Sequence, residues 1–254
     1  MNPRYFIAPA VLACLSLSVC IGADASLAEL IKKGDALDAQ LKTKAALDTF
    51  LEAEKLAPNN AELLRRIAKE YDESMVDVSS KEEKKRLAEL GLTYAKRAVA
   101  AEPENATAQL ALAICYGRVA PYLDSKTKIG YSKLVKLHTD KSLVLDPNND
   151  YAHHVLGAWN YELANLGALL RTVAKLIYGE IPAASNEDAV AHFKKAIELM
   201  PQRVAHHVEL GRTYAAMGKT DLARVEFNKG LSLPSREKDD PDSKARAKEA
   251  LGKL

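Results

Sequence analysis

The sequence predicts an all-α protein, a right-handed solenoid of about five helical hairpins with a capping helix at its C-terminus. Three observations carry this prediction. The 254-residue chain is 48% hydrophobic but only 6% aromatic, which favours helices packed through small side chains. A pattern of small and aromatic residues recurs along the chain, and each copy ends at a proline.

The repeated pattern is clearest near the C-terminus. Gly211 precedes Tyr214 by three residues, Ala223 precedes Phe227 by four, and Pro234 follows. This is the tetratricopeptide pattern, with Leu-Gly-x-x-Tyr on a first helix, Ala-x-x-x-Phe on a second and a closing Pro. Small residues let the two helices approach, the large residue fills the gap, and the proline ends the second helix.

Similar marks upstream divide the chain into units. In units one and five, 12 residues separate the first-helix Gly from the second-helix Ala. The separations in units two to four are larger, which predicts long insertions between their helices. We expect these insertions to narrow or cover the concave groove of the solenoid. The predicted units span residues 27–60, 61–105, 106–149, 150–203 and 204–235, followed by a capping helix at 241–253.

Capping patterns mark where two of the second helices begin. Ser80 is followed three residues later by Glu83, and Ser185 by Asp188. A serine that accepts a hydrogen bond from the backbone three residues on is a common helix start. The sequon at Asn105 is interpreted in the same way, as a helix cap.

Prolines and glycines predict the breaks in units three and four. Pro121 should end the first helix of unit three, with a polar loop to about Gly130. The first helix of unit four should run from residue 150 to 178, either continuously or with a bend near Gly167.

The first 25 residues differ from the rest. Arg4 precedes an uncharged run from residue 5 to 22, and Ala23-Asp24-Ala25 fits a signal-peptide cleavage site. We therefore predict a signal peptide at 1–25 and an exported, periplasmic protein. The alternative is a membrane anchor through residues 5–22, which is almost long enough to span a bilayer.

The cysteines fit this interpretation. Two of the three, Cys14 and Cys20, lie in the predicted signal peptide. Cleavage would leave only Cys115, so no internal disulfide is expected. Cys115 lies in an apolar helical run and is predicted to be a core residue.

Unit four resembles the core of the regulator of microtubule dynamics family, and the resemblance covers roughly residues 60 to 254. It rests on an Asp-Pro end of one repeat, a Leu-Gly-x-Trp-x-Tyr run, an Arg on the long helix, and a Phe-x-Lys-Ala helix. The matching residues are Asp146, Pro147, Leu156, Gly157, Trp159, Tyr161, Arg171, Ala174, Pro182, Ala189, Phe193, Lys195, Ala196 and Pro201.

The resemblance implies an irregular helical repeat domain. It also implies association with microtubules and with mitochondrial or endoplasmic-reticulum membranes, and in some members lipid binding. An exported bacterial-type protein would meet no microtubules, so the microtubule role and the export prediction exclude each other.

We predict four ligand-binding residues: Tyr161, His154, Arg171 and Arg212. Tyr161 should face the concave groove, where such repeats bind peptides. Arg171 lies among apolar residues and needs a partner, which is either structural, such as a carboxylate or a loop carbonyl, or an anionic ligand. Trp159 is predicted to be a core anchor.

The histidines invite a metal hypothesis, because His153, His154, His192, His206 and His207 all lie in units four and five. There is no His-Glu-x-x-His motif, and neighbouring histidines on one helix point about 100° apart. We therefore predict neither a metal site nor a cofactor. No catalytic constellation has credible spacing, so we predict no catalytic residues and no enzyme.

The predicted function is binding of a protein or peptide segment in the concave groove. The alternative is binding of a lipid or apolar small molecule along the long helix of unit four, with Arg171 at a head group. The formal net charge is only +2, with acids and bases mixed throughout, which argues against nucleic-acid binding.

Overall fold

The computed structural model describes residues 15–178 and 183–254, and these ranges contain helices and no strand. The α-helices are α1 (Leu15–Asp38), α2 (Thr43–Glu54), α3 (Ala61–Ser74), α4 (Lys81–Ala101), α5 (Ala106–Val119), α6 (Ser125–Leu145), α7 (Asp150–Ala164), α8 (Ala168–Tyr178), α9 (Asn186–Leu199), α10 (Val204–Ala216), α11 (Thr220–Ser232) and α12 (Asp240–Leu251). Two 3₁₀ turns, η1 (Met75–Asp77) and η2 (Ala120–Tyr122), follow α3 and α5.

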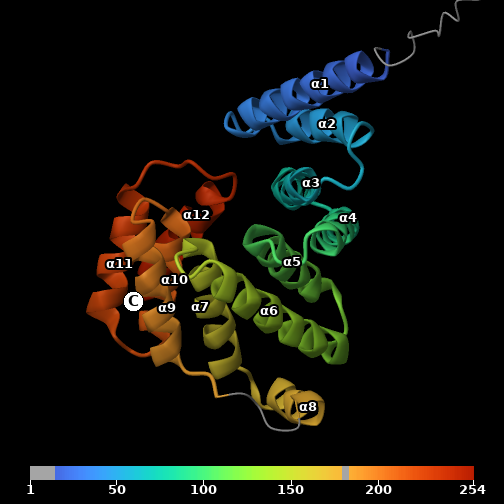
Figure 1. The fold of residues 1–254 in the computed structure, drawn as a ribbon. Helices are drawn as coiled ribbons and strands as arrows, with labels where there is room; N and C mark the ends of the chain where they lie inside the picture. The colour runs from blue at the N-terminus through green and yellow to red at the C-terminus, as the bar shows by residue number, and fades with distance from the viewer. Residues whose placement is uncertain (1–14, 179–182) are drawn as a thin grey trace, which may run out of the picture.

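The helices pair into five consecutive hairpins that stack into a curved array (Figure 1). The pairs are α1–α2, α3–α4, α5–α6, α7–α9 and α10–α11, and α12 packs on α10 and α11. Helix α8 lies between the two helices of the fourth hairpin in sequence but packs on α6. The predicted all-α, tetratricopeptide-like α-solenoid is confirmed.

In three hairpins, a glycine on the first helix lets the two helices pack closely around a phenylalanine of the second helix. A Cβ atom on Gly157 would lie 2.8 Å from the ring of Phe193, and one on Gly211 would lie 2.7 Å from the ring of Phe227. Gly34 and Phe50 meet in the same way. All three rings are fully buried, so each glycine leaves the space that its phenylalanine occupies.

Side-chain caps begin the helices where the sequence predicts them. Ser80 accepts a hydrogen bond from the backbone N–H of Glu83, and Ser185 accepts one from Asp188. Asn105 caps α5, as expected. Further caps that the sequence analysis did not name are Asn60, Asp124 and Asn149.

The predicted polar loop from Pro121 to about Gly130 is wrong. After η2, Asp124 caps α6, which begins at Ser125 because the Asp124 side chain accepts hydrogen bonds from two backbone N–H groups of the first turn. Most of the extra length of units two and three is added helix, since α4 and α6 each contain 21 residues. The bend near Gly167 is present, between α7 and α8.

The predicted signal peptide falls partly outside the described residues. Residues 1–14 lie outside them, and residues 15–25 form the first part of α1, which continues without a break to Asp38. Across the described part of the chain, no helix has both the length and the apolar character needed to cross a membrane.

Candidate functional site

A cavity of about 650 Å³ lies on the concave side of the array. Its walls come from the first helices α3, α5 and α7, with contributions from α12, the end of α1, both 3₁₀ turns and the linker between α11 and α12. This cavity is called the groove below. The first helices of a solenoid face its concave side, so the groove lies where repeat proteins of this shape present their binding surface.

The linker of residues 233–239 closes one side of the groove. Lys238 extends from it to η1, where its Nζ lies 2.9 Å from Oδ1 of Asp77. Asp239 lies 3.8 Å from the guanidinium of Arg118 on α5. The C-terminal end of the chain therefore folds back onto the second and third hairpins through ion pairs.

Arg118 and Asp72 form a close ion pair in the groove wall. The Arg118 Nε lies 2.8 Å from Oδ1 and 3.0 Å from Oδ2 of Asp72. Burial raises the pKa of the Asp72 carboxyl, and the guanidinium opposes that shift. The neighbouring carboxylate raises the pKa of Arg118 above its usual range, so the arginine stays charged and Asp72 is paired.

A second arginine, Arg203, also lines the groove. The Arg203 guanidinium lies 5.0 Å from the centre of the Tyr151 ring and 3.5 Å from carboxylate oxygens of both Asp150 and Glu237. Burial raises the pKa of Tyr151 to about 12. The wall thus offers a cation stacked on an aromatic face, which suits a ligand with carbonyl or carboxylate groups.

The groove lining combines both charge signs with exposed apolar groups. Seven acidic and eight basic residues line it. Leu41 and Val76 also line it, and each is 37% exposed. Ile114, Ala111 and Leu110 of α5 add an apolar strip.

Three of the four predicted ligand-binding residues lie together at the contact between α7 and α10. The Arg212 guanidinium lies 4.0 Å from the centre of the Tyr161 ring and pairs with Glu162 and Glu209. His154, two turns before Tyr161, is hydrogen-bonded to His206 of α10, with 3.0 Å between their Nδ1 atoms. None of these residues lines the groove cavity.

Arg171 lies apart from the other three. It is exposed on α8, and its guanidinium donates a hydrogen bond of 3.2 Å to the carbonyl of Ala164 at the end of α7. This is the structural alternative, a bond to a carbonyl near a loop. The described residues of α8 do not line the groove.

The histidines and one glutamine form a regular clamp between repeats. In three units the residue six positions after the closing proline donates a hydrogen bond to that proline's carbonyl oxygen. The three pairs are Gln109–Pro103, His153–Pro147 and His207–Pro201, at 2.6, 3.1 and 3.1 Å.

The other end of each clamp side chain contacts the second helix of the hairpin. Gln109 reaches His138, His153 reaches His192, and His207 reaches Glu226. These side chains therefore tie one repeat to the next, and their polar atoms are occupied by protein partners. The six-residue offset from each proline is the sequence signal that could have identified the clamp.

Trp159 and Cys115 are core residues, as predicted. Trp159 is buried, and its Nε1 donates to the carbonyl and hydroxyl oxygens of Ser132. Cys115 lies on α5 and is buried, and burial raises the pKa of its thiol.

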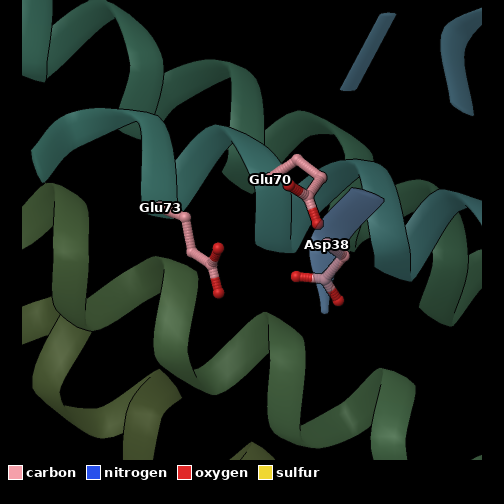
Figure 2. Close-up of side chains that lie close together, drawn as sticks. All are labelled: Asp38, Glu70 and Glu73. Atoms are coloured by element: carbon pink, nitrogen blue, oxygen red, sulfur yellow. The ribbon is translucent and has the colours of Figure 1, made fainter. Parts of the chain in front are cut away.

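The groove edge also holds a group of carboxylates that the sequence analysis missed. Within residues 15–178 and 183–254, Asp38, Glu70 and Glu73 form a group of potential metal ligands, with one oxygen of each within 4.8 Å of the others (Figure 2). Asp38 ends α1 and the two glutamates lie on α3, so only the packing of the first two hairpins brings them together.

The comparisons with solved structures agree with this architecture. The chain superposes on the crystal structure of TTC0263, a thermophilic TPR protein of Thermus thermophilus, with a TM-score of 0.61 and 22% identity. The match covers 89% of this chain and 98% of that one. PilF of Pseudomonas aeruginosa matches with a TM-score of 0.54 and 14% identity, over 92% of this chain and 93% of that one.

The comparisons with sequences identify the family. The chain is 28% identical over 239 residues to regulator of microtubule dynamics protein 1 of Mus musculus, which is 93% of this chain and 78% of that protein. It is 30% identical over 194 residues to the protein of the same name from Bos taurus, which is 76% of this chain and 61% of that protein. The family described as "Regulator of microtubule dynamics protein 1-3" matches residues 30–254, and the chain belongs to this family.

Proposed function

We propose that this chain is a non-enzymatic scaffold that binds a segment of another protein in its groove. The observation that carries the proposal is the groove itself, about 650 Å³ in volume and lined by the first helices of consecutive hairpins. A tetratricopeptide-like solenoid presents such a surface already formed, so the ligand alone loses conformational freedom on binding.

The lining indicates the chemistry of the partner. Leu41 and Val76 place apolar surface in contact with water on a wall that also carries both charge signs. A segment with a few apolar side chains between acidic and basic ones would cover the apolar groups and pair with Arg118 or Arg203. A strongly basic or acidic polymer would meet as many like charges as opposite ones.

Selection from a peptide library tests this function. Peptides enriched on the purified chain should bind Val76→Glu at least about tenfold more weakly, because the new charge meets the peptide's apolar side chains. The matched control is Val225→Glu on α11, which is 62% exposed and does not line the groove. Equal affinity for both variants, or no enriched peptide, would count against groove binding.

Lipid or apolar-ligand binding at α8 is a second candidate. Leu176 on α8 is 82% exposed, and Arg171, five residues earlier on the same helix, carries a positive charge. Native mass spectrometry should then detect a bound lipid that is lost in Leu176→Asp and retained in Val144→Asp, an equally exposed site on α6. A purified chain with only its own mass would exclude this candidate.

Two proposals remain, export and association with microtubules, and the cellular location of the chain distinguishes them. The names of the relatives suggest microtubules, whereas residues 1–25 suggest an exported chain cut after Ala25. N-terminal sequencing of the chain from fractionated cells tests export, with Ser26 as the expected first residue. Co-sedimentation of the chain with assembled microtubules tests the alternative.

A further inference from the structure

The carboxylates of Asp38, Glu70 and Glu73 meet where the first hairpin packs on the second. Glu70 and Glu73 are three residues apart on one face of α3. Asp38, the last residue of α1, lies close to both (Figure 2). One oxygen from each residue lies within 4.8 Å of the other two. Ligands of one Ca²⁺ at 2.3–2.6 Å can be no more than about 5 Å apart, so the spacing fits a shared ion.

Glu70 gives an independent reason to expect a ligand. Its side chain is 0% exposed, and neither carboxylate oxygen accepts a hydrogen bond from the described residues. Among the residues that the structure describes, both oxygens are buried side-chain atoms without a hydrogen-bond partner. A buried carboxylate without compensation is strongly unfavourable, so a proton or a cation must accompany it.

Lys69 neutralises only part of the negative charge of the three carboxylates. Its Nζ lies 2.5 Å from Asp38 and 2.8 Å from Glu73, but 3.9 Å from Glu70, which is beyond hydrogen-bond distance. One ammonium among three carboxylates leaves two negative charges. The lysine side chain is 37% exposed, so its ammonium group can move to solvent when another cation arrives.

We propose that Asp38, Glu70 and Glu73 form a site for a hard divalent cation, with Ca²⁺ as the favoured ion. All the ligand atoms are carboxylate oxygens, which hard cations prefer. Ca²⁺ tolerates irregular ligand positions, whereas Mg²⁺ requires near-octahedral geometry and retains waters. Asp38 and Glu73 line the groove, so the ion has a route to the site.

Protons compete with the ion at Glu70. Burial, together with the neighbouring Asp38 and Glu73 charges, raises the pKa of Glu70 to about 8, against the opposing effect of Lys69. The bound ion would link α1 to α3 beside the groove.

Isothermal titration of the chelator-treated chain with CaCl₂ and, separately, MgCl₂ tests the site. Ca²⁺ should bind with one-to-one stoichiometry and more tightly than Mg²⁺. Glu70→Gln keeps the side-chain shape and should weaken Ca²⁺ binding at least about tenfold, the effect of losing one charged ligand. Lys69→Met removes the competing ammonium and should tighten binding by a similar factor.

Glu62→Gln is the matched control. Glu62 lies on the same helix, pairs with Arg65 and Arg66, and is not part of the carboxylate group. Its binding should equal that of the unmodified chain. Absence of saturable Ca²⁺ binding at pH 8 would overturn the proposal and leave a proton on Glu70 as the compensation. Ca²⁺ binding that is unchanged in Glu70→Gln would also overturn it, because the ion would then occupy surface carboxylates.

Discussion

Lys238, in the linker between α11 and α12, lies with its Nζ 2.9 Å from Oδ1 of Asp77 in η1. The pair connects the last structural segment of the chain to the second hairpin, across the groove that the stacked hairpins form. Any long ligand of the groove must share this space with the linker. The ion pair therefore bears directly on how accessible the groove is.

Lys238→Ala should loosen the linker without unfolding the solenoid. Asp77 is more than half exposed, and pairs of this kind contribute up to about 1 kcal/mol. Hydrogen exchange of residues 235–239 should accelerate, and 1 M NaCl should have a similar effect on the unmodified chain through screening. Lys44→Ala breaks an exposed pair within α2 and serves as the control. Unchanged exchange in Lys238→Ala would show that other contacts hold the linker.

Gly211→Ala should destabilise the fifth hairpin. In most helix interiors, replacement of glycine by alanine stabilises by up to about 1 kcal/mol. Here the added Cβ would lie 2.7 Å from the buried Phe227 ring, so we expect a net loss of about 1–3 kcal/mol in the free energy of unfolding. Gly130→Ala on α6 is the control, because its Cβ would meet nothing within 4 Å, and it should stabilise. Urea denaturation measures both. Equal effects would exclude the proposed packing role.

The hairpins were predictable because repeat packing leaves local marks. The Gly211 and Phe227 spacing, the Ser80 and Ser185 caps and the buried Trp159 all follow from residues close together in sequence. The groove was not predictable in the same way. Its closing contacts join residues far apart in sequence, such as Asp77 and Lys238, and their proximity depends on the accumulated curvature of the whole stack.

The predicted ligand residues illustrate the same limit. Tyr161 and Arg212 lie on successive first helices, as expected, but they satisfy each other across the contact between α7 and α10. A sequence shows which residues are on first helices; it does not show which of them face one another. Asp38 and Glu70 were missed for the same reason, since they meet only through the packing of α1 on α3.

Cys115 should resist alkylation in the folded protein. The side chain is buried, and burial raises the pKa of its thiol, so almost no thiolate is available to react. Iodoacetamide labelling at pH 8, followed by peptide mass spectrometry, should modify Cys115 only after urea is added. Rapid labelling under native conditions would mean that α5 opens locally.

Acid should destabilise the contact between α7 and α10 through His154. Burial and the neighbouring His206 lower its pKa well below 6.5. Above pH 6.5 both the folded and unfolded chains are neutral at this residue, and its contribution is complete. Below pH 6.5 the unfolded chain takes up the proton first, so stability falls by up to about 1.4 kcal/mol per pH unit.

Urea denaturation at pH 7.5, 6.5 and 5.5 measures this loss. His154→Gln removes the titrating group, and its free energy of unfolding should fall less between pH 6.5 and 5.5 than that of the unmodified chain. A parallel fall in both proteins would assign the acid sensitivity to other residues.

In chelator-treated protein, Glu70 should make the free energy of unfolding fall as the pH rises, which is opposite to the effect of His154. Its folded pKa of about 8 lies above the ordinary value of 4.5, so the folded chain favours the protonated form. The contribution of Glu70 is fully present below pH 4.5 and is lost as the pH rises toward 8. Glu70→Gln resembles the protonated carboxyl at every pH, so its advantage in stability should grow from pH 5 to pH 8. Added Ca²⁺ should reduce that advantage at pH 8, because the ion binds more tightly to the chain that retains the carboxylate. An advantage independent of pH would mean that Glu70 carries its charge in the fold.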